Sequence, residues 1–168
     1  MTFVKKLNTL FLFIISMGIV LLIYSWYSSY QFDNNPISKD IQDKIAKKEY
    51  EILRLIKKHY NVNLKVPLTI TNKMNSKLFG MAIFDTKTNS IKIYLNKKRF
   101  KESLDYMLKD VLPHEYAHAL MFNFGDFSNI NGGHTLAWEK ACLNLNGVKC
   151  DRFVNHNDIA IEKTNFFK

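Results

Sequence analysis

The chain has 168 residues, a formal net charge of +9 and a hydrophobic content of 47%. Its length is typical of a single domain. Its aromatic content of 14%, with only six glycines and three prolines, excludes a disordered, collagen-like or low-complexity chain. Two cysteines are too few for a disulfide-rich scaffold or for a zinc site of four thiolates. The positive charge at first indicates a phosphate-rich partner, such as nucleic acid or anionic lipid.

The apolar residues are concentrated near the N-terminus, where residues 7–32 carry no charged side chain and follow two lysines. About 20 helical residues cross a bilayer core of about 30 Å. We therefore predict a cytoplasmic N-terminus at 1–6, a transmembrane signal anchor at 7–30 and a linker at 31–37. The positive-inside rule then places the remaining domain on the outer side of a single-pass membrane, which is the periplasmic side of a bacterial inner membrane if the source is bacterial. A cleaved signal peptide is the alternative, although no clear small-x-small site follows the apolar run.

After the linker, the sequence predicts a helix, a strand and a hairpin. Ser38 is a candidate N-cap, and isoleucines and leucines recur with helical spacing over 39–60. Residues 66–71 have the composition of a strand. The apolar segments 79–84 and 91–95 flank a polar turn, which is the pattern of a β-hairpin.

The second half of the chain is predicted to be mostly helical. Apolar residues continue with helical spacing over 100–111. Pro113 either kinks this helix or lies in the first turn of a new helix, which stops at Gly125. A loop is predicted at 126–133 and a further helix at 134–146.

Residues 114–118 form the pattern His-Glu-x-x-His within an apolar, helical context. Positions four apart lie on one face of a helix, about 5–6 Å apart, so His114 and His118 can bind one metal ion. Zinc suits neutral imidazole ligands. Glu115 lies beside that face, where it can accept a proton from a water molecule that the metal activates. The alternative is a pair of surface histidines next to a carboxylate.

A catalytic zinc site usually has three protein ligands and one open position. Asp126, His134 and Glu139 could each supply the third ligand. His134 follows two glycines, which allow the backbone to turn sharply. Glu139 lies five residues further along the same predicted helix, about 140° around it, so both side chains cannot easily face one ion. A glutamate about twenty residues after the second histidine is nevertheless the third ligand in another zincin branch, and this choice stays open here.

The motif at 114–118, followed by Gly133-His134 and by Trp138 four residues later, resembles the SprT-like zinc metallopeptidases. The resemblance implies that His134 is the third ligand and that the cofactor is Zn²⁺. It also implies hydrolysis of peptide bonds in a protein or peptide substrate, with Glu115 as the general base.

The resemblance covers roughly residues 38–150 and implies an α+β fold, a minimal zincin-like domain with a small β-sheet packed on the active-site helix. We assign this domain to 38–154 and a polar tail to 155–168. Thr135 departs mildly from the family pattern, in which a small residue follows the histidine. Some relatives cleave proteins crosslinked to DNA, but the apolar N-terminus argues against nucleic acid as a partner.

Two further features bear on this site. Cys142 and Cys150 can form a disulfide if the domain lies outside the cytoplasm, and two independent buried thiols are the alternative. Residues 79–82 form either an edge strand that binds substrate as an added strand, as zincins commonly do, or an ordinary core strand.

Three functions are compatible with these patterns. The preferred one is a membrane-anchored zinc metallopeptidase, and the others are a non-catalytic zinc-binding envelope protein and, for a cytoplasmic domain, a DNA–protein-crosslink protease. Residues 7–168 carry a net charge of +7 (22 basic minus 15 acidic side chains), which is compatible with phosphate, lipid or acidic proteins. With the anchor in place, the adjacent lipid surface is the simplest partner for this charge.

Overall fold

The computed structural model describes residues 2–128 and 130–151. The predicted polar tail at 155–168, and the last residues of the predicted domain, lie outside the described residues. The chain divides into two compact units, Met1–Ile37 and Ser38–Lys168, and each is described by itself.

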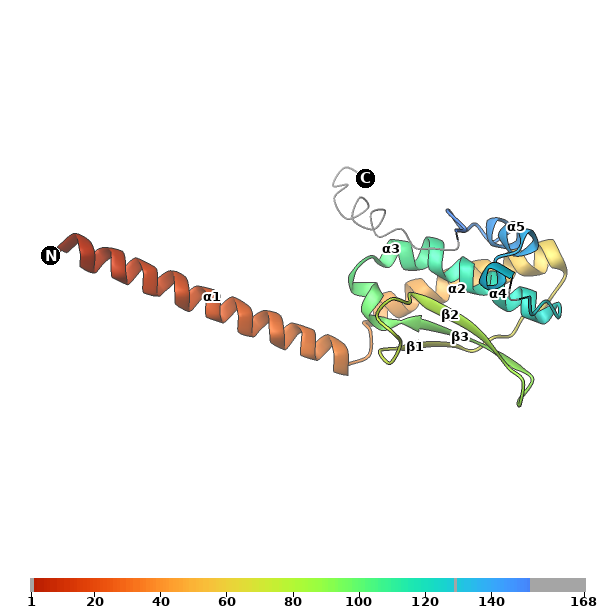
Figure 1. Cartoon of the computed structure of the whole chain (residues 1–168), viewed down its shortest axis with the longest axis horizontal. Coiled ribbons are helices and arrows are strands. Elements are labelled where there is room, and N and C mark those ends of the chain that lie inside the picture. The colour runs from red at the N-terminus through yellow and green to blue at the C-terminus, as the bar shows by residue number, and fades with distance from the viewer. Residues whose placement is uncertain (1, 129, 152–168) are drawn as a thin grey trace. The chain divides into compact units, whose positions relative to one another are not determined.

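The first unit is a single helix, α1 (Thr2–Asn34) (Figure 1). The helix is long and apolar enough to cross a membrane, and its apolar stretch is not buried by protein. It extends beyond the predicted anchor at both ends. It stops just before Pro36, because a proline ring disfavours helical conformation in the residue that precedes it.

The second unit begins with α2 (Lys39–Tyr60), which has the predicted bounds. Its apolar stripe is buried, with Ile52 and Ile56 fully inaccessible to solvent. The helix ends at Asn61, which adopts a left-handed conformation with φ of 54° and donates its N–H to the carbonyl of Lys57. Ser38 occupies the N-cap position, but its side chain makes no capping hydrogen bond.

The sheet has three strands, β1 (Leu68–Thr71), β2 (Gly80–Asp85) and β3 (Ser90–Asn96), in the order β1-β3-β2. The predicted hairpin is confirmed, since β2 pairs antiparallel with β3 and Ala82 lies opposite Ile93. β1 starts two residues later than predicted and pairs in parallel with β3. β2 is therefore an edge strand, and the helices α2, α4 and α5 lie on one side of the sheet (Figure 1).

The region between β3 and the metal-binding motif is helical but irregular. It contains a 3₁₀ turn η1 (Lys97–Lys101), a short helix α3 (Leu104–Tyr106) and a π-helical turn η2 (Met107–Val111), which leads directly into α4 (Leu112–Asn123). Pro113 lies in the first turn of α4, which is one of the two predicted outcomes. In the π turn, Leu112 donates its N–H to the carbonyl of Met107 five residues earlier. The turn leads directly into α4, so the chain stays helical through Pro113.

The last described helix, α5 (Leu136–Asn144), is shorter than predicted at both ends. His134 does not belong to it, because the Thr135 side chain caps the helix by accepting the N–H of Trp138 at 3.2 Å. The disulfide Cys142–Cys150 joins this helix to the segment that follows it, and the two Cα atoms lie 5.8 Å apart. The disulfide considered from the sequence is thus present in the structure.

Candidate metal centre

Three histidine side chains converge at one point. His134 Nε2 lies 3.2 Å from His114 Nε2 and 3.3 Å from His118 Nε2. The candidate ligand atoms of the three residues all lie within 4.8 Å of one another, so the cluster could hold a metal ion. The structure therefore brings together the three residues that the sequence proposed as ligands.

The local sequence explains this convergence. His114 and His118 are one helical turn apart on α4, whose other sides are buried in the domain. The chain then turns back through η3 (Ile130–Gly133), where Gly132 and Gly133 adopt left-handed φ values of 66° and 84°. Residues with a Cβ rarely adopt this conformation, so the glycines return His134 to the helix that carries the other two histidines.

Two of the nitrogen–nitrogen distances in the cluster fit a tetrahedral metal site. For Zn–N bonds of about 2.0–2.1 Å, two ligands of a tetrahedral ion lie about 3.3–3.4 Å apart. The two closest nitrogen pairs, at 3.2 and 3.3 Å, have almost this separation. Burial, followed by the neighbouring histidines, lowers the pKa of His114 to about 3 and that of His118 to about 4. Both rings are therefore neutral at pH 7, which is the form that binds a metal.

Trp138 forms a wall of the cluster. Its ring centroid lies 4.3 Å from that of His134, 4.7 Å from that of His114 and 5.1 Å from that of His118. The side chain is only 1% exposed, and its Nε1 has no hydrogen-bond partner among the residues that the structure describes. The tryptophan therefore restricts all three imidazoles by packing rather than by hydrogen bonding.

Glu115 lies under the edge strand next to this cluster. Its side chain is only 5% exposed, and its carboxylate accepts the backbone N–H of Ala82. Burial raises the pKa of Glu115 to about 8, and the Ala82 hydrogen bond opposes that change. A carboxyl group in this state can exchange a proton near neutral pH.

The outer edge of β2, with which no other strand of the described residues pairs, lies beside Glu115. Ile93 of the central strand donates its N–H to Pro67, on the β1 side. Its partner in the hairpin, Ala82, therefore has its own N–H and C=O directed away from β3. The same alternation applies to Gly80 and Phe84, two residues to either side. Residues 79–82 thus combine core packing with an edge position, because Phe79 is buried whereas β2 is an edge strand; the binding of substrate to this edge stays a prediction.

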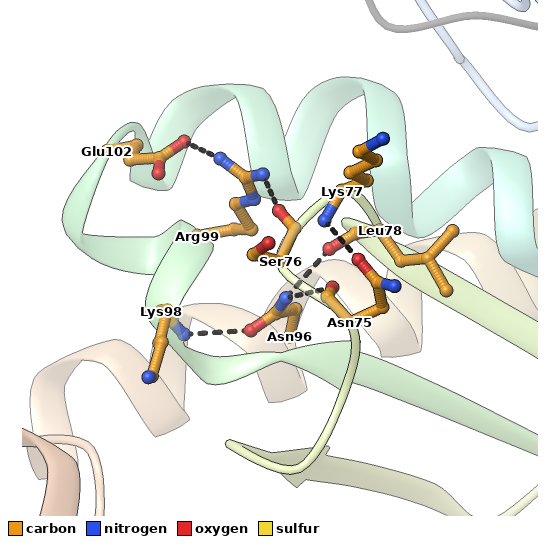
Figure 2. A network of polar contacts seen from close by, with 8 residues as sticks. All are labelled: Asn75, Ser76, Lys77, Leu78, Asn96, Lys98, Arg99 and Glu102. Carbon is orange, nitrogen blue, oxygen red and sulfur yellow. Dashed lines mark hydrogen bonds and ion pairs between the residues drawn. The ribbon is translucent and has the colours of Figure 1, made fainter.

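Asn96 is a structural residue that the sequence analysis did not identify. It is 1% exposed, and its Nδ2 donates to the carbonyls of Asn75 and Leu78 at 3.2 and 2.8 Å (Figure 2). Its Oδ1 accepts the N–H of Lys98, which caps η1. Asn96 therefore fixes the loop that leads into β2. A lone asparagine after a strand gives no sequence signal for this role.

The other candidate ligands lie elsewhere. Glu139 is an exposed residue in the first turn of α5 and does not belong to the histidine cluster. Asp126 accepts the backbone N–H of Ser128 at 3.0 Å, within its own loop. Because His134 precedes the helix cap, the argument that it shares a helix with Glu139 is wrong.

Comparisons with known proteins agree with the motif. The model of the SprT-like family matches residues 49–162, which is more than half of the chain. Protein SprT of Vibrio atlanticus (strain LGP32) is 34% identical over 79 residues, covering 47% of this chain and 45% of that protein. The matched region thus spans less than half the length of that relative. No solved structure matches significantly. The extent of the family match shows that the chain belongs to the SprT-like family.

Proposed function

We propose that this protein is a membrane-anchored zinc metallopeptidase with a minimal zincin-like domain. The observation that carries the proposal is the histidine cluster of α4 and the following loop, together with the buried Glu115 beneath an open strand edge. Membership of the SprT-like family supports the same reading.

His114, His118 and His134 would hold the zinc ion. Bound zinc supplies a Lewis acid that polarises a peptide carbonyl and makes water more acidic. Structural zinc sites are usually closed by four protein ligands, whereas catalytic sites have three and an open position. Among the described residues the cluster contains three ligands, which favours a catalytic site over the non-catalytic alternative.

Glu115 is the proposed general base. It would accept a proton from the attacking water and then transfer that proton to the amine of the departing peptide. The pKa of about 8 belongs to the metal-free protein, in which burial keeps the carboxyl group largely protonated at pH 7. A bound zinc ion would favour the ionised form, which can accept the proton.

The substrate is proposed to be an extended protein or peptide segment. The free edge of β2 can bind such a segment as an additional strand through main-chain hydrogen bonds, which tolerate many sequences. No feature of the described residues specifically favours a nucleic-acid-linked substrate.

The domain is proposed to lie on the outer side of the membrane. The apolar helix α1 and the Cys142–Cys150 disulfide support this location, because disulfides persist in oxidising compartments. A topology reporter fused after Lys168 tests it. Reporter activity on the cytoplasmic side would contradict the proposed location but would leave the proposed chemistry open to direct assay.

The chemistry is tested with the full-length chain in detergent micelles, loaded with zinc and given unfolded casein as substrate. Glu115→Gln keeps the size of the side chain but removes the base, so zinc remains bound and hydrolysis falls at least about 10²-fold. Glu139→Gln is the matched control, since it changes an exposed glutamate outside the cluster. Equal hydrolysis by the Glu115→Gln variant and the wild type would refute the mechanism.

A further inference from the structure

Gly80, the first residue of β2, lies unusually close to Glu115. A Cβ atom built on Gly80 would be 2.7 Å from Cγ and 2.7 Å from Oε1 of the glutamate, and 3.0 Å from its Cδ. All three distances are at or below the closest approach of a real Cβ atom. The position therefore requires glycine for space, and its φ is not in the left-handed region.

The same strand contacts Glu115 at a second point, two residues further on, where Ala82 donates its backbone N–H to the carboxylate. The glutamate is thus packed against the backbone of Gly80 and hydrogen-bonded to Ala82. With a side chain only 5% exposed, it has little free space in which to adopt another rotamer.

The strand itself is firmly held in place. Phe79, just before Gly80, accepts the N–H of Asn96 at 2.8 Å, and the Asn96 side chain bonds to the carbonyls of Asn75 and Leu78. Arg99 donates to the carbonyl of Ser76 in the same loop (Figure 2). An added side chain at residue 80 would therefore displace the glutamate more readily than the strand.

We propose that Gly80 is a positioning residue for Glu115. The bare backbone at this position lets the edge strand approach closely enough to fix the direction of the carboxylate, so the surface proposed to bind substrate also orients the proposed base. The catalytic part of this inference rests on the proposed function, whereas the contact between the two residues does not.

The contact is tested by a double-mutant cycle on the full-length, zinc-free chain in detergent. Gly80→Ala is measured in the wild type and in Glu115→Ala, which removes the atoms that the new methyl group would meet. We expect Gly80→Ala to lower Tm by about 5 °C in the wild type and by less than about 1 °C in the Glu115→Ala background. Equal shifts in the two backgrounds would overturn the proposal.

The catalytic consequence is tested with the zinc-loaded chain. Gly80→Ala should lower kcat for casein about 10²-fold while zinc affinity changes less than about 3-fold, because the base is displaced and the histidines are not. Tyr50→Ala, which changes an exposed residue of α2 outside both the histidine cluster and β2, is the control and should retain wild-type kcat. Full kcat in Gly80→Ala would overturn the positioning role. If the wild type itself lacks activity, the proposed function fails and the stability cycle alone decides whether Gly80 positions Glu115.

Discussion

Replacing Glu115 with glutamine should stabilise the metal-free protein while abolishing its proposed activity. The structure buries this carboxyl group and raises its pKa from 4.5 to about 8. Below pH 4.5 the group is protonated in both the folded and unfolded states. As pH rises from 4.5 to 8, the unfolded state releases the proton and the folded state keeps it. The contribution of Glu115 to wild-type stability therefore falls across this window and levels off above it.

The size of the effect follows from the shift. A difference of 3.5 pH units (8 minus 4.5) at about 1.36 kcal/mol per unit gives an upper limit of about 5 kcal/mol. Glutamine can still accept the Ala82 N–H, but its buried amide donors lose water, at a cost of about 1–3 kcal/mol. The net gain for Glu115→Gln is thus about 2–4 kcal/mol above pH 8.

The assay is urea or thermal unfolding of the full-length chain in detergent with a chelator present, at several pH values between 5 and 9. The histidine cluster is present in both proteins, so its contribution cancels in the difference. With zinc present the gain should shrink, because a nearby cation favours the ionised carboxylate of the wild type. A variant that is no more stable than the wild type at pH 9, or a gain that does not grow with pH, would refute this account of the buried carboxyl.

Four further predictions concern the cluster and its support. His134→Ala should weaken zinc binding more than about 100-fold in competition with a chromophoric chelator, since it removes a direct ligand; unchanged affinity would contradict its assignment. Asn96→Ala should destabilise the protein by about 2–4 kcal/mol in urea unfolding, because it leaves buried carbonyls unpaired; a change below about 0.5 kcal/mol would contradict this. Gly147→Ala should hinder the Cys142–Cys150 disulfide, because its Cβ would lie 2.6 Å from both sulfur atoms. Protein purified in air and then unfolded for a thiol assay should therefore contain more free thiol than the wild type; a fully oxidised variant would contradict this prediction. Acidifying the zinc-free Glu115→Gln variant, which lacks the opposing carboxyl group, from pH 6.5 to 4 should lower Tm, because His114 and His118 bind protons in the unfolded state but stay neutral in the folded state; a constant Tm would show that the rings are not desolvated.

Local patterns in the sequence predicted much of this architecture. The helix at 39–60 and the hairpin could be predicted because the spacing of apolar residues differs between a helix and a strand, and short polar segments separate the elements. His114 and His118 could be predicted as a pair of ligands because side chains four positions apart lie on one face of a helix, whatever the rest of the fold is. The family resemblance identified His134 as the third ligand. Helical geometry alone could not do so, because a loop separates His134 from α4.

A side-chain cap, an irregular helical turn and a long-range contact were not predicted from the sequence. The capping of α5 by Thr135 excludes His134 from the helix, and the prediction of a helix at 134–146 did not take this cap into account. The π turn before Pro113 has no periodic signature of its own. The approach of Gly80 to Glu115 joins residues 35 positions apart in the sequence, and only the packed fold brings them together.

Under the proposed membrane anchoring, the short connection between the two units would limit where the site can act. Only residues 35–38 separate the end of α1 from the start of α2, and four residues span at most about 14 Å. A domain of this size has a diameter of about 35 Å. With α1 in a bilayer, the histidine cluster could reach polypeptides only within about 50 Å of the membrane surface. Proximity to the membrane would then select substrates, in addition to any preference for their sequence.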